Sequence, residues 1–584
     1  MSGDSKGARE SIATALVAIA ENHLEVFCGT DGKVYASRKG VNVANVVGES
    51  GGAVRDLLSS FYYELNGKVA GRAAATEALD VLRARARMTE RKAVYVRTAR
   101  VDGTVYVDLG WGAHLENCYL FITPVSWGIE RGSIPQKFRR TELTGPIMAL
   151  HPDNEHAVPG SYDESNITKS LEQLRELLNV KPEHWQIVVG WMVAVLLDGG
   201  PVPVLLLTGE QGTGKTSTAR VISNLLDPSP APVIAPPRDD HQWAVIAAAR
   251  RVVCIDNLST VPDWLSDALC RAVTGDGFLR RLLYSDDGIA MNEFRRAIIL
   301  TSIDAGAIRG DLAERMLPVE LEVIDPTSRR SERELNEELA TIVPQAFEEI
   351  VNLAWNCMGL EIDGVVAADR PRMADFADVL ARVDLMTGWE SLDHYRRTVA
   401  RSLADAIAGD HLAEAVAAHL AIVGSWKGTA KELLDVLSRW RPDDGRGWPK
   451  GPRGVVGVLK RLAVPLRTQG IDVRTGRDHA GRWISLTSSK SGDAKRDGVT
   501  VVTVVPTSKV REKEEERDSA SRKHRHDRHD DANRHATEIV NADGGDAAWP
   551  KRTAIPCTSC GAIALTDNGE PCLITPGCDG RHAA

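Results

Sequence analysis

The sequence has no hydrophobic stretch long enough to cross a membrane. Its longest apolar run, residues 187–197, is about half the roughly 20 residues that a membrane helix needs, and an aspartate follows it. The first residues mix charges into an amphipathic helical pattern, without the basic region and apolar core of a secretory signal. We therefore expect a cytoplasmic protein that has no membrane partner.

Aromatic residues and an excess of positive charge are also lacking. Phe, Trp and Tyr make up 5% of the 584 residues, and the formal net charge is −9. The chain as a whole is not a general polyanion binder, so any nucleic-acid site must be a local basic patch. The length exceeds what one hydrophobic core supports, and we expect several domains.

Cysteine is infrequent, and five of the nine cysteines are scattered at spacings that predict no metal site. These five are expected to be reduced residues of a reducing compartment. The other four, with a histidine close behind them, fall after residue 556: Cys557, Cys560, Cys572, Cys578 and His582. The count fits a four-ligand Zn²⁺ site in which the histidine can replace a cysteine of the loosely spaced second pair. Unligated tail cysteines are the alternative.

Hydrophobic patterning predicts a multidomain α/β protein. An N-terminal α/β domain is expected over residues 1–165, where two helical stretches precede a hairpin around Asp102-Gly103. Helices alternate with apolar strands over residues 166–325, which is typical of a parallel sheet with crossover connections. A helical extension is expected over residues 326–420, followed by a small Arg- and Trp-rich domain over residues 421–488.

Residues 489–552 have almost no apolar periodicity and include a mixed-charge, histidine-rich run. Such a composition cannot bury enough apolar surface to fold, so we interpret this segment as a disordered linker. Metal binding by its histidines is the alternative. The linker would tether residues 553–584, which hold the clustered cysteines of the expected zinc knuckle.

A glycine-rich loop between a strand and a helix predicts a nucleotide site. The apolar strand 202–207 leads into the loop, and a helix is expected over residues 217–226. Backbone N–H groups would converge on phosphate oxygens, Lys215 would reach the β- and γ-phosphates, and the Thr216 hydroxyl would bind Mg²⁺. The residues expected to hold ATP are Gly209, Glu210, Gln211, Gly212, Thr213, Gly214, Lys215, Thr216 and Ser217.

A second apolar strand ends in an acidic residue, as a Mg-ATP site requires. Residues 251–255 precede Asp256, whose carboxylate is placed to hold Mg²⁺ through water. A buried strand that merely ends in aspartate is the alternative. Asn257 follows, where many motor ATPases carry a glutamate that polarises the attacking water. Asparagine orients water but accepts no proton from it. The sequence therefore indicates ATP hydrolysis less directly than ATP binding.

Three further residues are candidates for contact with the γ-phosphate. The third apolar strand ends at Thr301, a polar side chain expected beside that phosphate. Arg309 and Arg315 flank a short helix before the next strand, where an arginine commonly reaches a neighbouring subunit's site. The alternative for each arginine is a surface ion pair with Asp311 or Glu314.

The chain resembles bacterial and phage ATPases related to the poxvirus-type primase-helicases, through LLLTGEQGTGKTSTARVISNLLDPSPAPVIAPPRDD and VVCIDNLSTVPDWLSDALCRAVTGDGFLRRLLYSDD. The likeness covers residues 1–490 and is densest over residues 201–322. It implies a ring-forming AAA+ core close to superfamily 3 helicases, hence a homo-oligomer. An aspartate-asparagine pair is usual in that family, whereas the third strand usually ends in asparagine, not in a residue such as Thr301. Residues 1–165 leave no room for a primase domain, so any primase is expected to be a separate partner.

The resemblance also gives meaning to the basic segment 274–284. In superfamily 3 helicases a hairpin at this place projects into the ring channel. The resemblance therefore implies that Arg280, Arg281 and Tyr284 contact single-stranded or forked DNA. The alternative is that Phe278 and Tyr284 are core residues and that the arginines are solvated.

Residues 421–488 combine a helix–helix–hairpin pattern with a local excess of positive charge. Thr429 is expected to cap a helix over residues 430–440, and a second helix is expected from Pro452. The pattern resembles the winged-helix domain that ends many of these ATPases. DNA binding is expected here, with protein docking as the alternative. The residues expected to contact DNA are Arg453, Lys460, Arg461 and Arg467.

Three functions follow from these features. The first is an ATP-dependent DNA helicase or translocase of a phage or mobile-element replication system, with ATP, Mg²⁺ and Zn²⁺ as cofactors. The second is a DNA-binding replication initiator or regulator that uses ATP as an assembly switch, and Asn257 keeps this possibility open. The third is an ATPase of a mobile-element defence system, which shares the same motifs.

Overall fold

The computed structural model describes most of the chain between residues 11 and 488. The described residues are 11–48, 52–110, 117–147, 169–275, 278–281, 289–292, 294–302, 312, 314–325, 327, 329–360, 371–408, 410–442, 445, 448–479, 481–488, 554–556 and 563–565. The chain divides into two units, residues 1–498 and 499–584. In the second unit only two antiparallel strands are described, β19 (Ala554–Pro556) and β20 (Ile563–Leu565). The predicted linker lies outside the described residues, and so do the predicted zinc ligands Cys557, Cys560, Cys572, Cys578 and His582.

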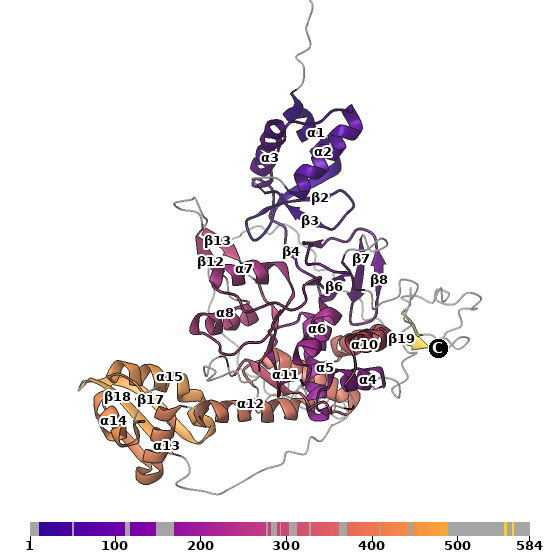
Figure 1. Cartoon of the computed structure of the whole chain (residues 1–584). Helices are drawn as coiled ribbons and strands as arrows, with labels where there is room; N and C mark the ends of the chain where they lie inside the picture. Colours follow the sequence, from indigo (N-terminus) through magenta and orange to yellow (C-terminus); the bar gives the residue numbers. More distant parts are fainter. Residues whose placement is uncertain are drawn as a thin grey trace, which may run out of the picture. The chain divides into compact units, whose positions relative to one another are not determined.

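Residues 11–86 form a small module with a hydrophobic core of its own. Three helices pack on a three-stranded antiparallel sheet of order β1-β2-β3 (Figure 1). The helices predicted over residues 53–66 and 72–88 are confirmed, although the second ends two residues early. The elements are α1 (Ile12–His23), β1 (Leu24–Cys28), β2 (Val34–Arg38), β3 (Ala44–Val46), α2 (Ala53–Asn66) and α3 (Arg72–Ala86).

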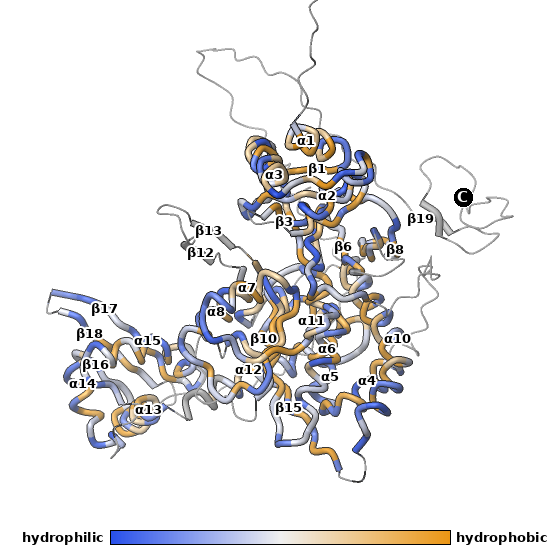
Figure 2. The backbone as a smooth tube through the Cα atoms, turned by 45° about the horizontal axis from the view of Figure 1, so that its top comes forward, coloured by the Kyte–Doolittle hydropathy of each residue, from blue (hydrophilic) through white to orange (hydrophobic). Residues whose placement is uncertain are grey.

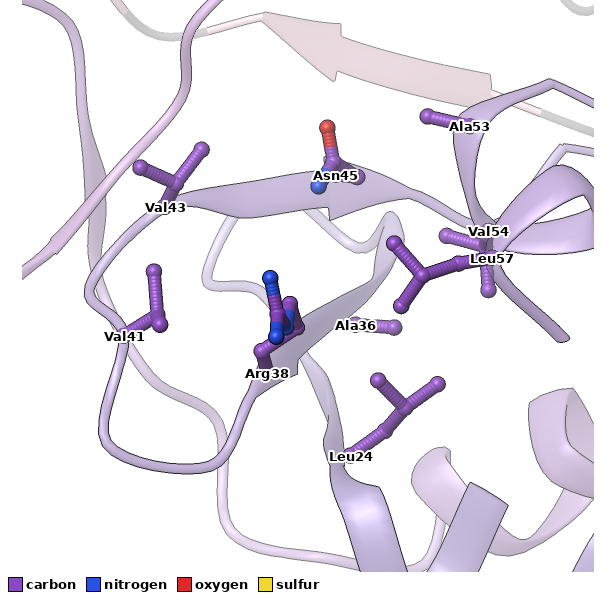
Figure 3. Close-up of a pocket in the computed structure, with 9 residues that line it drawn as sticks. All are labelled: Leu24, Ala36, Arg38, Val41, Val43, Asn45, Ala53, Val54 and Leu57. Carbon is purple, nitrogen blue, oxygen red and sulfur yellow. The ribbon is translucent and has the colours of Figure 1, made fainter. Parts of the chain in front are cut away.

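A small cavity of about 140 Å³ opens in this module between β2, β3 and the start of α2 (Figure 3). Aliphatic side chains such as Leu24, Val54 and Leu57 line most of it. Arg38 on β2 and Asn45 on β3 supply its polar atoms.

The next segment is a β-module that packs against the following domain. The predicted hairpin turn at Asp102-Gly103 is confirmed, with φ of 49° and 77° at the two residues. The inner faces of β6 and β7 belong to the same hydrophobic cluster as the parallel sheet described below, through residues such as Val107 and Leu120. The strands are β4 (Val94–Tyr95), β5 (Thr98–Val101), β6 (Thr104–Asp108), β7 (Cys118–Ile122), β8 (Trp127–Arg131) and β9 (Lys137–Phe138).

A buried ion pair joins this β-module to the parallel-sheet domain. Arg97, 2% exposed, donates from Nε to Asp227 Oδ1 at 2.8 Å and from Nη1 to the Asp108 carbonyl oxygen at 2.8 Å. Burial raises the pKa of Asp227, but Arg97 and Arg250 outweigh that effect and hold the pKa below its ordinary value. Because a buried charge without a partner costs several kcal/mol, on the order of 3–5, this contact is stable only when fully paired.

The parallel sheet has the order β11-β14-β10-β15, and all of its neighbouring strands run parallel. Hydrophobic residues follow β10 and the strands beside it (Figure 2), as expected for strands that helices cover. The apolar run 187–197 lies within α5 and is buried in this domain. The elements are α4 (Lys169–Leu178), α5 (Pro182–Leu197), β10 (Val204–Thr208), α6 (Lys215–Leu226), α7 (Asp240–Ala249), β11 (Val252–Ile255), α8 (Asp263–Thr274), β14 (Ala297–Thr301) and β15 (Met316–Glu320). The predicted mixed α/β fold with a parallel sheet is therefore confirmed.

Three long helices follow β15, as the predicted helical extension requires. A capping box, in which the Ser331 hydroxyl accepts from the Glu334 backbone N–H and the Glu334 carboxylate accepts from the Ser331 backbone N–H, begins α10 (Glu332–Gly359). The other two helices are α11 (Ala374–Thr387) and α12 (Ser391–Ala408). None of the described helices has both the length and the hydropathy to span a bilayer.

Residues 411–488 form a C-terminal module with a separate hydrophobic cluster. The predicted helix–helix–hairpin order is present, and the Thr429 cap is confirmed by a capping box with Glu432. Sequence patterning did not predict β16, which completes the antiparallel sheet β16-β18-β17. The elements are α13 (His411–Val423), β16 (Ser425–Gly428), α14 (Ala430–Leu437), a 3₁₀ turn (Ser438–Trp440), α15 (Pro452–Thr468), β17 (Ile471–Asp478) and β18 (Gly481–Ser488).

Candidate nucleotide site

The glycine-rich loop connects the end of β10 to the start of α6. Gly209, Gly212 and Gly214 have φ of 147°, 86° and 83°, a region that side-chain-bearing residues rarely adopt. A Cβ on Gly209 would lie 2.9 Å from the Thr213 hydroxyl oxygen, so the loop has no room for a side chain there. Helix α6 begins at Lys215, two residues earlier than predicted, which places its first N–H groups at the loop.

Lys215 lies within the curve of this loop. Its Nζ donates to the carbonyl oxygens of Gly209 at 2.8 Å and Glu210 at 2.7 Å. Partial burial lowers the pKa of Lys215, and the Asp256 carboxylate opposes that shift. The ammonium group is therefore held among loop atoms at the place where a phosphate chain would need it. Glu210 and Gln211 are exposed on the outside of the loop.

The Asp256 carboxylate, directly after β11, is contacted by residues from α6 and β14. The Thr216 hydroxyl, in the first turn of α6, donates to Oδ1 at 2.9 Å and lies 3.1 Å from Oδ2. The Thr301 hydroxyl, at the end of β14, also donates to Oδ1. Hydroxyl and carboxylate oxygens are the ligands that Mg²⁺ prefers, so the residues fit the metal that the loop motif implies.

Sheet order explains why these residues meet. β14 lies between β10 and β11, so Thr301 sits between the loop and Asp256 at the carboxyl edge of the sheet. Asn257 follows in a left-handed conformation with φ of 56°, and its backbone N–H donates to the Thr301 hydroxyl oxygen at 2.9 Å. Thr301 is 1% exposed. Its hydroxyl contacts both Asp256 and Asn257 at the end of β11.

A second feature of the site was missed by sequence reasoning. A cavity of about 430 Å³ adjoins the loop, with Leu178, Asn179, Thr213 and Ile324 in its wall; Ser217 also lines it. Asn179 follows α4 with a φ of 57°, and its Nδ2 donates to the carbonyl oxygens of Thr213 and Glu322. The asparagine that directly follows α4 was the available signal, since asparagine tolerates the left-handed region.

Of the two predicted arginines, Arg315 is described, and it is not part of this cluster. Arg315 precedes β15, and its carbonyl oxygen accepts from the Val204 backbone N–H at 2.7 Å, at the amino end of β10. That end lies roughly 13 Å along the strand from the loop. Glu314, one suggested ion-pair partner of Arg315, bonds Arg372 at 2.5 Å. Arg309 lies outside the described residues.

The expected hairpin between the second and third motifs is confirmed in its backbone. β12 (Phe278–Arg281) pairs antiparallel with β13 (Ile289–Asn292), in a register that opposes Arg281 to Ile289. Arg280 and Arg281 therefore lie on β12. Tyr284 lies outside the described residues.

In the C-terminal module, α15 separates an apolar face from a basic one. Its buried residues include Val455, Leu459, Leu462 and Leu466, at the spacing of one helix face. Arg453, Lys460 and Arg467 are exposed and seven residues apart, so they share another face. Arg461 is exposed beside them. In the adjoining sheet, Lys427 of β16 lies over the ring of Trp483 of β18, 4.8 Å from its centroid.

Two family comparisons match the chain. Residues 171–406 match the family described as actinomycete integrative conjugative element replication protein. Residues 412–503 match the family described as the AICE RepA C-terminal domain. Together these matches span more than half of the chain and include both the loop and the basic helix. No curated protein sequence matches the chain significantly.

Solved structures give only a distant likeness. An apo structure of the NrS-1 C-terminal region is 11% identical and covers 82% of this chain and 99% of its own, with a TM-score of 0.35. The structure titled SCCmec type IV Cch, active helicase, is 11% identical and covers 80% of this chain and 93% of its own, with a TM-score of 0.38.

Substitution of the two charged residues should separate nucleotide binding from turnover. Lys215→Ala should weaken ATP binding by about tenfold to a hundredfold, because it removes a charge-assisted bond to phosphate. Asp256→Ala should retain ATP binding and lose Mg²⁺-dependent hydrolysis. Equilibrium binding of a fluorescent ATP analogue and phosphate release measure the two effects.

Arg220→Ala is the matched control, because Arg220 is an exposed cation on the same helix α6 and pairs with Glu332. It should bind ATP as the wild type does. Unchanged ATP affinity in Lys215→Ala would show that the loop is not the nucleotide site.

Proposed function

Since the chain belongs to the family of actinomycete integrative conjugative element replication proteins, we propose that it is the ATP-driven DNA helicase of such an element. One observation carries the proposal: Thr216, Asp256 and Thr301 converge beside a glycine loop that also holds Lys215. This is the group of side chains that Mg-ATP hydrolysis requires. The family match supports a replication role, and no observation favours the defence role.

Within this site each residue has a distinct task. The loop N–H groups and Lys215 bind the phosphate chain, while Thr216 and Asp256 hold Mg²⁺, which neutralises charge on the β- and γ-phosphates. The adjoining cavity of about 430 Å³ falls in the size range of small-ligand sites and takes the nucleoside. Thr301 orients Asp256 through its hydroxyl group and contacts the γ-phosphate.

Arg315 is proposed to serve a neighbouring subunit in a homo-oligomeric ring. It stands at the amino end of β15, on the edge of the sheet opposite its own loop. It therefore cannot assist its own site by a side-chain movement alone. In a ring, the same position can face the next subunit, where positive charge stabilises the transferred phosphoryl group. Arg309 is the second candidate for this role.

DNA is proposed to contact two basic features. Arg280 and Arg281 lie on the β12–β13 hairpin, which we place along a single strand in the ring channel. The basic face of α15, in a module that we interpret as a winged helix, neutralises further phosphates through Arg453, Lys460, Arg461 and Arg467. A separate primase and a Zn²⁺ site in the C-terminal cysteines complete the proposed replication assembly.

A second function is favoured by Asn257. The acidic strand ends in Asp256-Asn257, and neither Asn257 nor Thr301 can accept a proton from water at neutral pH. A protein with such a site could bind ATP to assemble on DNA and hydrolyse it slowly, as a replication initiator or regulator. The ATP-dependent step would then be assembly and not translocation.

Unwinding of a forked DNA duplex distinguishes these functions. The full chain should separate the strands with Mg-ATP, and Lys215→Ala should not. If the wild-type chain binds the fork and ATP but releases no strand, the initiator function replaces the helicase function. A chain that binds neither would contradict both.

The basic face of α15 generates a prediction about salt dependence. Lys460→Glu should weaken DNA binding at least severalfold and reduce the slope of log affinity against log salt by about 0.7–0.9 for each phosphate contact that is lost. Lys431→Glu, an exposed lysine on α14 of the same module, is the matched control and should bind normally. Fluorescence anisotropy from about 50 to 200 mM salt measures the DNA affinity of both variants and its salt dependence. Equal slopes would show that α15 does not contact DNA.

Mixing two inactive variants tests whether Arg315 is an arginine finger, a residue that stabilises the transferred phosphoryl group in a neighbouring subunit's site. Arg315→Ala should fold, bind ATP and hydrolyse it about 10³–10⁵-fold more slowly, because the transition state loses its compensating charge. Mixed with Lys215→Ala, it should regain activity at interfaces that combine an intact loop with an intact arginine. Absence of recovery, in mixtures shown to co-assemble, would mean that Arg315 is not a finger in trans.

A further inference from the structure

The connection between β15 and α10 passes along the glycine loop. We call residues 321–331 the strap, of which residues 326 and 328 are not described. The Leu321 carbonyl oxygen lies 3.4 Å from the place where a Cβ on Gly209 would stand. Ile324 Cδ1 lies 3.7 Å from the position of a Cβ on Gly214. Arg329 Nη2 lies 3.8 Å from the position of a Cβ on Gly212. The strap therefore approaches the loop at each of its three glycines.

Hydrogen bonds fix the start of the strap beside the loop. The Leu321 N–H donates to the Thr208 carbonyl oxygen at 2.9 Å, and the Glu322 N–H donates to the Asn179 carbonyl oxygen at 2.9 Å. Asn179 Nδ2 donates to both Glu322 and Thr213, so one amide connects strap and loop. The capping box of α10 fixes the far end of the strap at Ser331.

The strap brings two cations toward the loop: Arg329 lies at Gly212, and Arg330 lines the adjoining cavity. Within the described residues the exposed guanidinium of Arg329 has no ion pair or hydrogen bond. The next arginine differs, because Arg330 pairs with Glu338 of α10 at 3.2 Å. The Arg329 guanidinium, at Gly212, adds a second positive charge to the loop that holds Lys215. Such a cluster is favourable when the groups share an anion, and guanidinium binds phosphate through two parallel N–H donors.

We propose that Arg329 binds the phosphate chain of the nucleotide held by the loop of its own subunit. The proposal rests on the proposed nucleotide site and adds a residue that the loop motif does not contain. Arg329 and Arg315 then act from different subunits: Arg329 on the nucleotide of its own loop, and Arg315 on that of the neighbour.

Nucleotide affinity tests the contact. Arg329→Ala in the full chain should bind a fluorescent ADP and ATP about tenfold or more weakly, the loss expected for one charge-assisted bond. Arg329→Lys should recover part of the loss, since lysine retains the charge without the paired donors. Arg333→Ala is the matched control, because Arg333 is exposed on α10 and pairs with Glu337. It should bind as the wild type does.

Two outcomes separate this proposal from the one on which it rests. Unchanged affinity in Arg329→Ala, together with loss in Lys215→Ala, would overturn the role of Arg329 alone. Unchanged affinity in both variants would overturn the nucleotide site itself.

A mixing experiment tests whether Arg329 acts within its own subunit. Arg329→Ala and Arg315→Ala subunits, each impaired alone, should regain ATP hydrolysis when mixed, because an intact loop and strap can then face an intact Arg315. If Arg329 acted across the interface, both arginines of a nucleotide site would come from one neighbouring subunit. Every site in the mixture would then lack one of them. Lack of recovery in that mixture, when Lys215→Ala and Arg315→Ala do recover together, would refute action in cis.

Discussion

The Asp256 carboxylate, shared by two threonine hydroxyl groups, is the contact on which the site depends. Thr216 comes from the helix after β10, Thr301 from β14 and Asp256 from β11. The three meet only because β14 lies between the other two strands. A change in strand order or a one-residue shift in register would turn Thr301 away from the carboxylate, since side chains alternate along a strand. The sheet therefore determines the chemistry of the site through its order and register.

The same domain is attached to the β-module by charges that are almost fully buried. Asp227, at the end of α6, accepts from Arg97 and from the backbone N–H groups of Arg251 and Val252. Because α6 begins at Lys215, one helix connects the phosphate loop to this ion-pair cluster. The β-module thus shares a hydrophobic core and a buried ion pair with the parallel-sheet domain. Residues 11–86 have a hydrophobic core of their own.

Sequence reasoning identified the elements whose signal is local. The loop glycines, the Asp102-Gly103 turn and the Thr429 cap each depend on a few neighbouring residues, and the structure contains all three. Contacts between distant segments carried no such signal. Nothing in the sequence around Thr301 indicates that it bonds Asp256, because that contact follows from strand order. The cavity beside Asn179 and the approach of Arg329 to Gly212 also depend on a connection that returns from β15.

In the function that we propose, the Asp256 cluster supports ATP hydrolysis and DNA controls its rate. The most direct measurement is the steady-state rate of phosphate release from Mg-ATP by the full chain, with and without single-stranded DNA. Turnover should rise severalfold with DNA and disappear when Mg²⁺ is chelated. A chain that binds ATP but shows no Mg²⁺-dependent phosphate release, with or without DNA, would contradict the proposed function.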